Sequence, residues 1–423
     1  MKKRVFILLA LTLVSCAKEK TSSDHNQPYD PNRSIEITSI TPTSGKAREK
    51  IIIKGSNFGT DKNDIQVLFN RKKAGIVSVR GDMIHVIAPL RADSENHISI
   101  VHGQDTIHSS VIFNYETTVN MSTVVGHPET SKEAKDQFDG SLIEARMRGP
   151  EWMVMDSEDN MFVVQRHQHR LRQVNVSKNI VTTLLTNNGS LWFRPPFKDG
   201  NIIYLADYKG YYIYRFDPER TWKPEMVRLE FPDQIKDIFV TSGTFNPVDH
   251  CMYLYLQSGY LVKFDLKKRT SEIVWQNEGI VCEGYICFDT LNPDLLYISM
   301  YERHCIASLN IKTKDIKIVA GVPGKAGWAD GKGSDALFHS PCQICVDEDG
   351  VIYVPDDENH VIRKVSTEGY VSTLIGQPGV LGYKDGIPGE ALLNRPRSVA
   401  LGSDHTIYVT DWMNHTIRGL RVE

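Results

Sequence analysis

Short runs of alternating apolar and polar residues recur along most of the chain, and turn residues separate them. Between residues 35 and 116 the runs read IEITSITP, KIIIKGSNFG, IQVLFN, MIHVIAP, HISIVHG and SVIFNYE. Alternation with a period of two puts successive side chains on opposite faces of a β-strand. Several such strands, broken by Gly, Pro and Asn, predict a small β-sandwich over residues 35–116.

Beyond residue 117 the strand pattern returns at a fixed period. The phrase PDDENHVIRKV is followed 55 residues later by TDWMNHTIRGL. At this offset the recurring pairs are Gly331 with Gly386, Pro341 with Pro396, Tyr353 with Tyr408, Asp356 with Asp411, His360 with His415, and Arg363 with Arg418. An earlier copy, 191 residues before the first, carries Gly140, Pro150, Phe162, His169 and Arg172 at matching positions. Self-similarity at a fixed period indicates a repeat architecture.

Three degenerate copies fill the interval between the clear ones. They read NIIYLADYKGYYIYRF, CMYLYLQSGYLVKFDL and NPDLLYISMYERHCIASL. Each keeps a strand, a turn and a strand, which is the core of a propeller blade. Three clear and three degenerate copies therefore predict a six-bladed β-propeller over residues 117–423.

The repeat also predicts how the ring of blades closes. The chain ends after the third strand of the last copy, and the missing fourth strand should resemble VSTLIGQPG at 371–379. A segment of that kind, MSTVVGHPE, stands at 121–129, before the first copy. Because an unpaired edge strand invites aggregation, we expect residues 119–125 to close the last blade.

Two of these segments resemble known families. The stretch ITPTSGKAREKIIIKGSNFGT, with Gly55, Asn57, Phe58 and Gly59, resembles the start of an IPT/TIG domain, which has an immunoglobulin-like fold. The repeated phrase resembles the NHL repeat, whose pattern falls on Pro341, Asp347, Gly350, Asn359 and His360. The resemblance implies an all-β protein, with an immunoglobulin-like β-sandwich followed by a six-bladed NHL-type β-propeller.

The N-terminus has the order of an export signal. Three basic residues precede the apolar run VFILLALTLV, which is too short to span a bilayer permanently and ends in Ser15-Cys16. The ending LVSC resembles the bacterial lipobox, which implies cleavage of residues 1–16 before an acylated Cys16. We expect residues 17–34 to be a flexible tether. The expected location is the outer membrane, with the protein lipid-anchored and exposed on the cell surface.

Charge and cysteine content narrow the function classes. A net charge of −3, with no basic stripe, argues against a nucleic-acid partner. Buried free thiols are the favoured interpretation of the remaining cysteines, although an export compartment also permits disulfides. These cysteines are Cys251, Cys282, Cys287, Cys305, Cys342 and Cys345.

The long loops and the hairpins between second and third strands should emerge on one face of the propeller, which makes that face the expected binding surface. Its candidate aromatic residues are Trp328, Tyr383, Trp412, Tyr208, Tyr211 and Tyr301, and its candidate polar residues are Arg166, His167 and Asn414. For Trp328 and Tyr383 the favoured interpretation is that each ring pins its own loop, and for Trp412 loop pinning and ligand binding are equally open. The recurring His169, His360 and His415 favour a structural role over metal binding.

Catalytic signals are weak. The innermost strands are mostly apolar, with Glu151 and Asp237 as exceptions, and no nucleophile or metal motif is present. We therefore expect no enzyme activity, no cofactor and no metal ion. The layout resembles lipoproteins found beside glycan-uptake systems in Gram-negative bacteria, which implies polysaccharide capture. The alternatives are a structural or protein-interaction module of an envelope complex, and a metal-dependent lyase or lactonase that uses the propeller channel.

Overall fold

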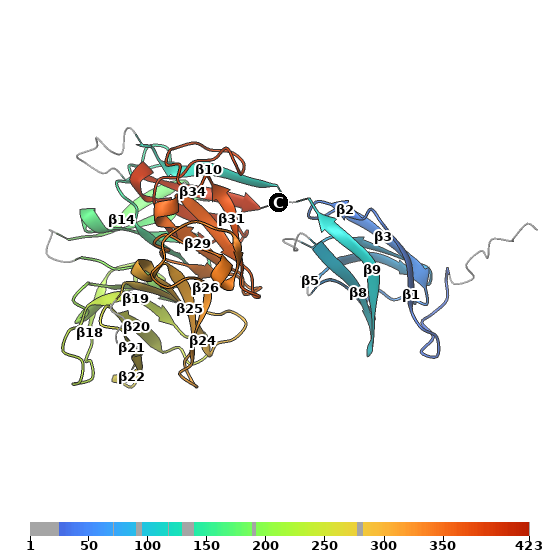
Figure 1. Ribbon diagram of the computed structural model, residues 1–423, viewed down its shortest axis with the longest axis horizontal. Helices are drawn as coiled ribbons and strands as arrows, with labels where there is room; N and C mark the ends of the chain where they lie inside the picture. The colour runs from blue at the N-terminus through green and yellow to red at the C-terminus, as the bar shows by residue number, and fades with distance from the viewer. Residues whose placement is uncertain are drawn as a thin grey trace, which may run out of the picture. The chain divides into compact units, whose positions relative to one another are not determined.

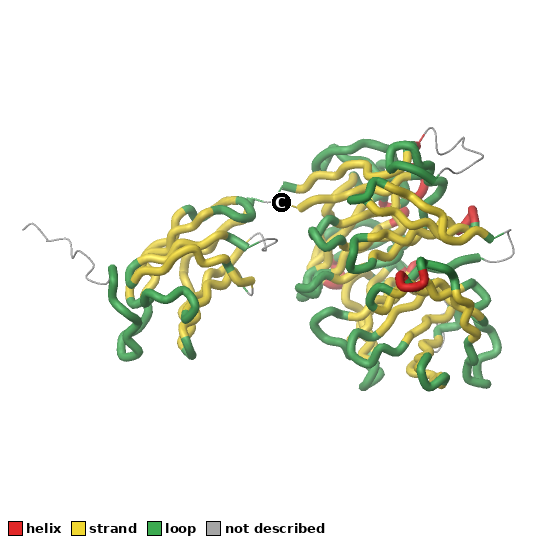
Figure 2. The backbone as a smooth tube through the Cα atoms, turned by 180° about the vertical axis from the view of Figure 1, so that it is seen from behind, coloured by secondary structure: helices red, strands yellow, loops and turns green. Residues whose placement is uncertain are grey.

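A computed structural model describes residues 25–70, 72–89, 95–116, 118–128, 139–187, 192–276 and 282–422. The chain divides into two compact units, one ending at Thr117 and one running from Thr118 to Val422. Each unit is built of strands joined by loops, as Figure 2 shows, and the predicted all-β class is confirmed. The predicted export signal, with Cys16, lies outside the described residues.

The first unit is a sandwich of two sheets. One sheet has the order β1-β3-β7-β6 and the other the order β2-β9-β8-β4-β5. Alternate side chains of each strand point inward, so that Ile51, Ile53, Phe69 and Phe113 are buried in one core. The strands are β1 (Glu36–Thr41), β2 (Ser44–Gly45), β3 (Lys50–Ser56), β4 (Ile65–Phe69), β5 (Lys72–Lys73), β6 (Gly75–Arg80), β7 (Met83–Ile87), β8 (Glu95–His102) and β9 (Asp105–Tyr115).

Part of the segment expected to be a tether, residues 17–34, lies against this sandwich. The Asn57 side chain accepts a hydrogen bond from the Asp30 N–H at 2.8 Å and donates to the Asp30 and Arg33 carbonyls at 2.9 and 2.6 Å. The Tyr29 ring stacks on His102, with 3.8 Å between ring centroids. Residues 25–34 therefore form part of the ordered surface of the sandwich.

The second unit consists of six sheets, each with four main strands, which are the predicted six blades. Blade 1 comprises β11 (Trp152–Met155), β12 (Asn160–Gln165), β13 (Arg170–Asn175) and β14 (Ile180–Thr186). Blade 2 comprises β15 (Phe197–Asp199), β16 (Ile202–Ala206), β17 (Tyr212–Phe216) and β18 (Glu225–Arg228). Blade 3 comprises β19 (Val240–Phe245), β20 (Met252–Leu256), β21 (Tyr260–Asp265) and β22 (Thr270–Gln276). Blades 4 and 5 comprise β23 (Gly284–Phe288), β24 (Leu295–Met300), β25 (Cys305–Asn310) and β26 (Ile316–Gly321); and β28 (Cys345–Val346), β29 (Ile352–Asp356), β30 (Val361–Val365) and β31 (Tyr370–Gly376), with β27 (Gly331–Lys332) added at its edge.

Blade 6 combines both ends of the propeller. It contains β32 (Pro396–Leu401), β33 (Ile407–Asp411), β34 (Thr416–Val422) and, as its outer strand, β10 (Val119–Gly126). Strand β10 pairs antiparallel with β34, from Val119 opposite Val422 to Gly126 opposite Thr416, and the two strands lie side by side in Figure 1. On its other side, Met121 exchanges two backbone hydrogen bonds with Gly386, at 2.9 and 3.0 Å.

A histidine ends the hairpin turn in several blades and joins that blade to the next. His304, His360 and His415 have positive φ angles of 57°, 60° and 58°. Their Nδ1 atoms accept hydrogen bonds from backbone N–H groups at 3.0, 3.2 and 3.0 Å, each lying just before the inner strand of the following blade. The predicted structural role is confirmed for His360 and His415.

Buried Arg–Asp pairs recur below these hairpins. Arg363 Nη1 donates to Asp356 Oδ2 at 2.8 Å, and Arg418 Nη1 donates to Asp411 Oδ2 at 2.8 Å. All four side chains are fully buried. The recurring Asp and Arg of the sequence are therefore parts of the scaffold.

The six cysteines from Cys251 to Cys345 are free thiols. Cys287 and Cys345 are partly buried, and the other four are buried.

Candidate functional site

The hairpins between the second and third strands of the blades lie at one end of the propeller, which we call the hairpin face. In each blade one hairpin residue lies one position after the second strand, or two positions after it in blade 2, and its type differs from blade to blade. These six hairpin residues are Arg166, Tyr208, Gln257, Tyr301, Asp357 and Trp412. Each blade thus contributes one variable side chain to the hairpin face.

A second group of variable side chains comes from the start of the innermost strands. Glu151, Arg194 and Cys342 occupy equivalent places, since their N–H groups donate to Val164, Ala206 and Pro355 carbonyls at 2.9, 3.0 and 2.9 Å. Arg397 aligns with Cys342 at the repeat offset. Blade 4 adds Glu283 and Tyr285 at the same end of β23.

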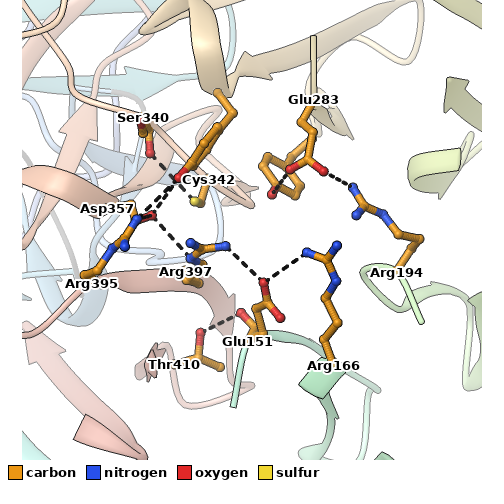
Figure 3. Close-up of polar contacts among 12 residues, drawn as sticks. Glu151, Arg166, Arg194, Glu283, Ser340, Cys342, Asp357, Arg395, Arg397 and Thr410 are labelled. Carbon is orange, nitrogen blue, oxygen red and sulfur yellow. Dashed lines mark hydrogen bonds and ion pairs between the residues drawn. The ribbon is translucent and has the colours of Figure 1, made fainter. Parts of the chain in front are cut away.

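The two groups join in a network of ion pairs, shown in Figure 3. Arg397 Nη1 donates to Glu151 Oε1 at 3.0 Å, and its Nε lies 3.2 Å from Asp357 Oδ2. Arg395 holds Asp357 with two hydrogen bonds, at 3.0 and 3.1 Å. Tyr301 Oη donates to Asp357 Oδ2 at 3.2 Å. The blade 5 hairpin is thus tied, through the start of the blade 6 inner strand, to the start of the blade 1 inner strand.

A second part of the network links blades 1 to 4. Arg194 Nη2 donates to Glu283 Oε1 at 3.0 Å, and Arg194 Nε donates to the Thr241 carbonyl at 3.2 Å. Arg166 Nη1 lies 3.7 Å from Glu151 Oε1. Residues that are distant in sequence therefore meet where the inner strands converge, as Figure 3 shows.

Burial governs the ionisation of the acidic groups in the network. Burial raises the pKa of Glu151, although Arg397 and Arg166 oppose the shift. Burial also raises the pKa of Glu283, but Arg194 outweighs it, and the net pKa lies below its ordinary value. Burial holds the pKa of the Cys342 thiol well above its ordinary value, so this thiol stays protonated and is a poor nucleophile.

Above the network, three aromatic rings form a continuous row that we call the aromatic row. His167 stacks against Trp412 with 6.2 Å between centroids and contacts Trp192 edge-on at 5.9 Å. Trp192 is 44% exposed and His167 is also exposed, whereas Trp412 is partly buried. Guanidinium groups lie against both tryptophans, with Arg397 4.1 Å from the Trp412 centroid and Arg166 4.9 Å from that of Trp192.

The other aromatic candidates divide into two groups. Tyr208 and Tyr301 belong to the hairpin residues and contact Gln257 and Asp357 through their hydroxyls. Trp328 and Tyr383 are part-exposed and hydrogen-bond to Thr373 and Thr123, which lie in the outermost strands β31 and β10. Trp328 and Tyr383 therefore pin their own loops at the blade periphery, as the favoured interpretation held. Tyr211 is 49% exposed, just before β17.

One polar candidate needs correction. Asn414 is buried, and its amide donates to the Gly382 carbonyl and to Asp411 Oδ2, both at 2.7 Å. Both amide hydrogens are used within the scaffold, so the structure places Asn414 in the blade rather than at the binding surface. Arg166 and His167, by contrast, lie in the aromatic row and the network beneath it.

Sequence reasoning missed Trp192, Arg194, Glu283, Asp357 and Arg397. Several of these residues stand beside a prolyl residue or a recurring aspartate, as in Arg194-Pro195, Pro396-Arg397 and Asp356-Asp357. These residues could have been found as charged residues that stand next to a recurring proline or aspartate, at positions where the residue type differs between the repeat copies.

Neither a metal-binding cluster nor a membrane-spanning helix is found among the described residues. Among the described residues, no group of three or more His, Cys, Asp or Glu side chains is placed to hold a metal ion. Within the same ranges, no helix has the length and apolar character needed to cross a bilayer.

Each of the two units contains a segment that matches a known protein family. Residues 36–115 match the IPT/TIG domain, and residues 393–420 match the NHL repeat. The chain is 26% identical over 296 residues to Protein SUPPRESSOR OF QUENCHING 1, chloroplastic, of Arabidopsis thaliana, a match that covers 66% of this chain and 26% of that protein. The chain therefore spans about a quarter of the length of this curated relative.

Solved structures resemble nearly the whole chain. A structural genomics protein of unknown function from Bacteroides thetaiotaomicron is 24% identical, with a TM-score of 0.79, over 94% of this chain and 100% of that one. An auxiliary nutrient binding protein from the same organism is 22% identical, with a TM-score of 0.64, over 94% and 99% of the two chains. An auxiliary nutrient binding protein from Bacteroides ovatus is 22% identical, with a TM-score of 0.63, over 94% and 100%. The chain thus contains an IPT/TIG domain followed by a β-propeller with an NHL repeat, a fold that it shares with these Bacteroides proteins.

Proposed function

We propose that this chain is an exported, lipid-anchored protein that binds a nutrient without chemically changing it, and that the nutrient is a polysaccharide. Two proteins of the same fold are auxiliary nutrient binding proteins, which supports the broader part of the proposal. The narrower part rests on the chemistry of the hairpin face.

The aromatic row is the observation that carries the proposal. Indole rings offer flat apolar faces, which suit the apolar faces of sugar rings. The rings of Trp192, His167 and Trp412 follow one another with 5.9 and 6.2 Å between centroids, so an extended glycan can contact more than one ring. Charged groups lie directly beneath and can orient hydroxyl groups.

A binding role rather than catalysis fits the state of the acidic groups. Asp357 is fully buried and its carboxyl group contacts Arg395, Arg397 and Tyr301, so its oxygens are engaged within the network. Glu151 is also buried and paired with Arg397. A general acid needs a carboxyl that can exchange a proton with substrate, and paired carboxylates of this kind are poor candidates.

Trp412→Ala is expected to weaken polysaccharide binding. Loss of one stacking face should cost about 1–3 kcal/mol, or roughly a tenfold to hundredfold drop in affinity. The measurement is calorimetry with a polysaccharide first found on a glycan array, together with thermal melting. Trp328→Ala removes a more exposed indole from the blade periphery and serves as the control. Unchanged binding by Trp412→Ala, or an equal loss in Trp328→Ala, would place the ligand elsewhere.

Cys16→Ala is expected to release the protein from the membrane fraction. If two or three acyl chains attach at Cys16, they supply most of the membrane affinity, because each buried methylene contributes about 0.8 kcal/mol. The measurement is fractionation of cells followed by immunoblotting. Cys345→Ala, which removes a thiol from β28, should leave the protein in the membrane fraction. Retention of Cys16→Ala in that fraction would refute the anchor.

A further inference from the structure

Among the described residues, buried side-chain nitrogens without a hydrogen-bond partner gather on the hairpin face. Those between blades 1 and 2 are Arg166 Nε, Arg194 Nη1 and Trp152 Nε1. In the same part of the structure, the buried acceptor Glu151 Oε2 also has no hydrogen-bond partner. An unpaired buried N–H costs free energy, and an unpaired charged one costs more, so such atoms mark places where a ligand or water completes the bonding.

The three donors lie at one boundary, between blades 1 and 2. The guanidinium carbons of Arg166 and Arg194 lie 5.5 and 5.2 Å from the centroid of the Trp152 ring. Trp152 and Arg194 are fully buried, whereas the Arg166 side chain is 21% exposed. Figure 3 shows both arginine side chains pointing inward, Arg166 toward Glu151 and Arg194 toward Glu283.

Of the arginines in the network, Arg166 has the longest ion-pair distance. Among the described residues its one ion pair is the contact with Glu151 at 3.7 Å, which is longer than an ordinary hydrogen bond. Arg395 and Arg397 each bond carboxylates on two residues at closer range. Arg166 also stacks over Trp192, whose exposed indole belongs to the aromatic row. A group that docks on this indole can therefore reach the Arg166 guanidinium.

We propose that the bound polysaccharide is acidic, and that Arg166 receives the carboxylate or sulfate of the sugar that stacks on Trp192. This inference rests on the proposed function. An anion supplies acceptors only, which matches a site with three unpaired donors, and its oxygens fit the fork of a guanidinium. A neutral sugar hydroxyl brings a donor with every acceptor and satisfies this arrangement less well.

The first test is a glycan array that presents uronic-acid, sulfated and neutral oligosaccharides to the purified full-length protein. We expect the retained glycans to be acidic, with the uronic-acid and sulfated members distinguishing the two anions. For a uronic-acid polymer such as polygalacturonate, methyl esterification removes the charge and keeps the sugar ring, so it should abolish binding. Retention of neutral glycans alone would overturn the inference and leave the proposed function standing. Retention of no glycan at all would overturn both.

The second test uses Arg166→Gln against the acidic glycan that the array identifies. Because a hydrogen bond to a charged group contributes about 1.5–3 kcal/mol, we expect a roughly tenfold to hundredfold loss of affinity. Arg166→Lys, which keeps the charge but not the fork, should recover part of it. Arg421→Gln removes the same charge from an exposed position in β34 and should bind like wild type. Thermal melting checks that each variant is folded, and full affinity in folded Arg166→Gln would refute the role of Arg166.

Discussion

Deleting residues 1–126 is expected to leave the propeller unfolded or aggregated, whereas deleting residues 1–117 should leave it folded. The longer deletion removes β10, whose Met121 and Val125 are each 1% exposed. Burial of two such side chains contributes roughly 3–6 kcal/mol, which is a large share of a typical folding free energy of about 5–15 kcal/mol. The deletion also exposes the edge of β34 along its whole pairing with β10, which favours association between chains.

The two shortened chains should be compared by chemical denaturation and by size-exclusion chromatography. A matched pair of substitutions in the intact chain removes any effect of truncation. Met121→Asp puts a charge on the buried face of β10, and Asn120→Asp puts one on its exposed face. Met121→Asp should be strongly destabilising and Asn120→Asp close to neutral. Equal stability of the two deletions, or of the two substitutions, would mean that β10 does not hold the last blade closed.

The sequence predicted the scaffold well because the scaffold repeats. The hairpin histidines bond the next blade, and the buried pairs Asp356–Arg363 and Asp411–Arg418 fix each hairpin to its own blade. Blades 5 and 6 pack their hairpins in the same way and use the same residue types at these positions. A fixed spacing of unlike residues is therefore sufficient to locate the blades from the amino-acid sequence alone.

The candidate site was harder to predict because it is built from positions that do not repeat. Asp357 and Trp412 occupy the same place in blades 5 and 6, and Cys342 and Arg397 share another. These side chains become partners only when the ring closes and brings different blades together. For Trp328 and Tyr383 the favoured loop-pinning role is confirmed, but an aromatic residue in a long loop has the same sequence signature whether it binds a ligand or pins the loop.

The buried pair in blade 6 leads to a prediction about stability and pH. Arg418 is fully buried and bonds both Asp411 and the Leu392 and Lys384 carbonyls. Arg418→Met keeps much of the side-chain volume but leaves Asp411 as an uncompensated buried carboxylate. Breaking a buried pair in this way costs about 3–5 kcal/mol, so the variant should unfold at markedly lower denaturant concentration.

The loss of stability caused by Arg418→Met should depend on pH. Burial, opposed by Arg418, raises the pKa of Asp411 from 3.8 to about 6, so the folded protein binds this proton more tightly than the unfolded chain does. Ionising Asp411 therefore costs stability, and the cost grows as pH rises from about 4 to 6 and is constant above. Without Arg418 the pKa should rise further. Arg418→Met should then be far less destabilising at pH 5, where Asp411 can be protonated, than at pH 8.

Blade 1 provides the control for this pH effect. Its equivalent arginine, Arg172, is also fully buried, but Gln165 stands where blade 6 has Asp411. Arg172→Met leaves a neutral amide behind, and its salt-bridge partner Asp139 is 43% exposed and can be hydrated. We therefore expect Arg172→Met to cost less than Arg418→Met at pH 8, and its cost should change little between pH 8 and pH 5. Urea denaturation of both variants at the two pH values measures the difference. Parallel pH profiles for the two variants would show that the Asp411 carboxylate is not the source of the loss.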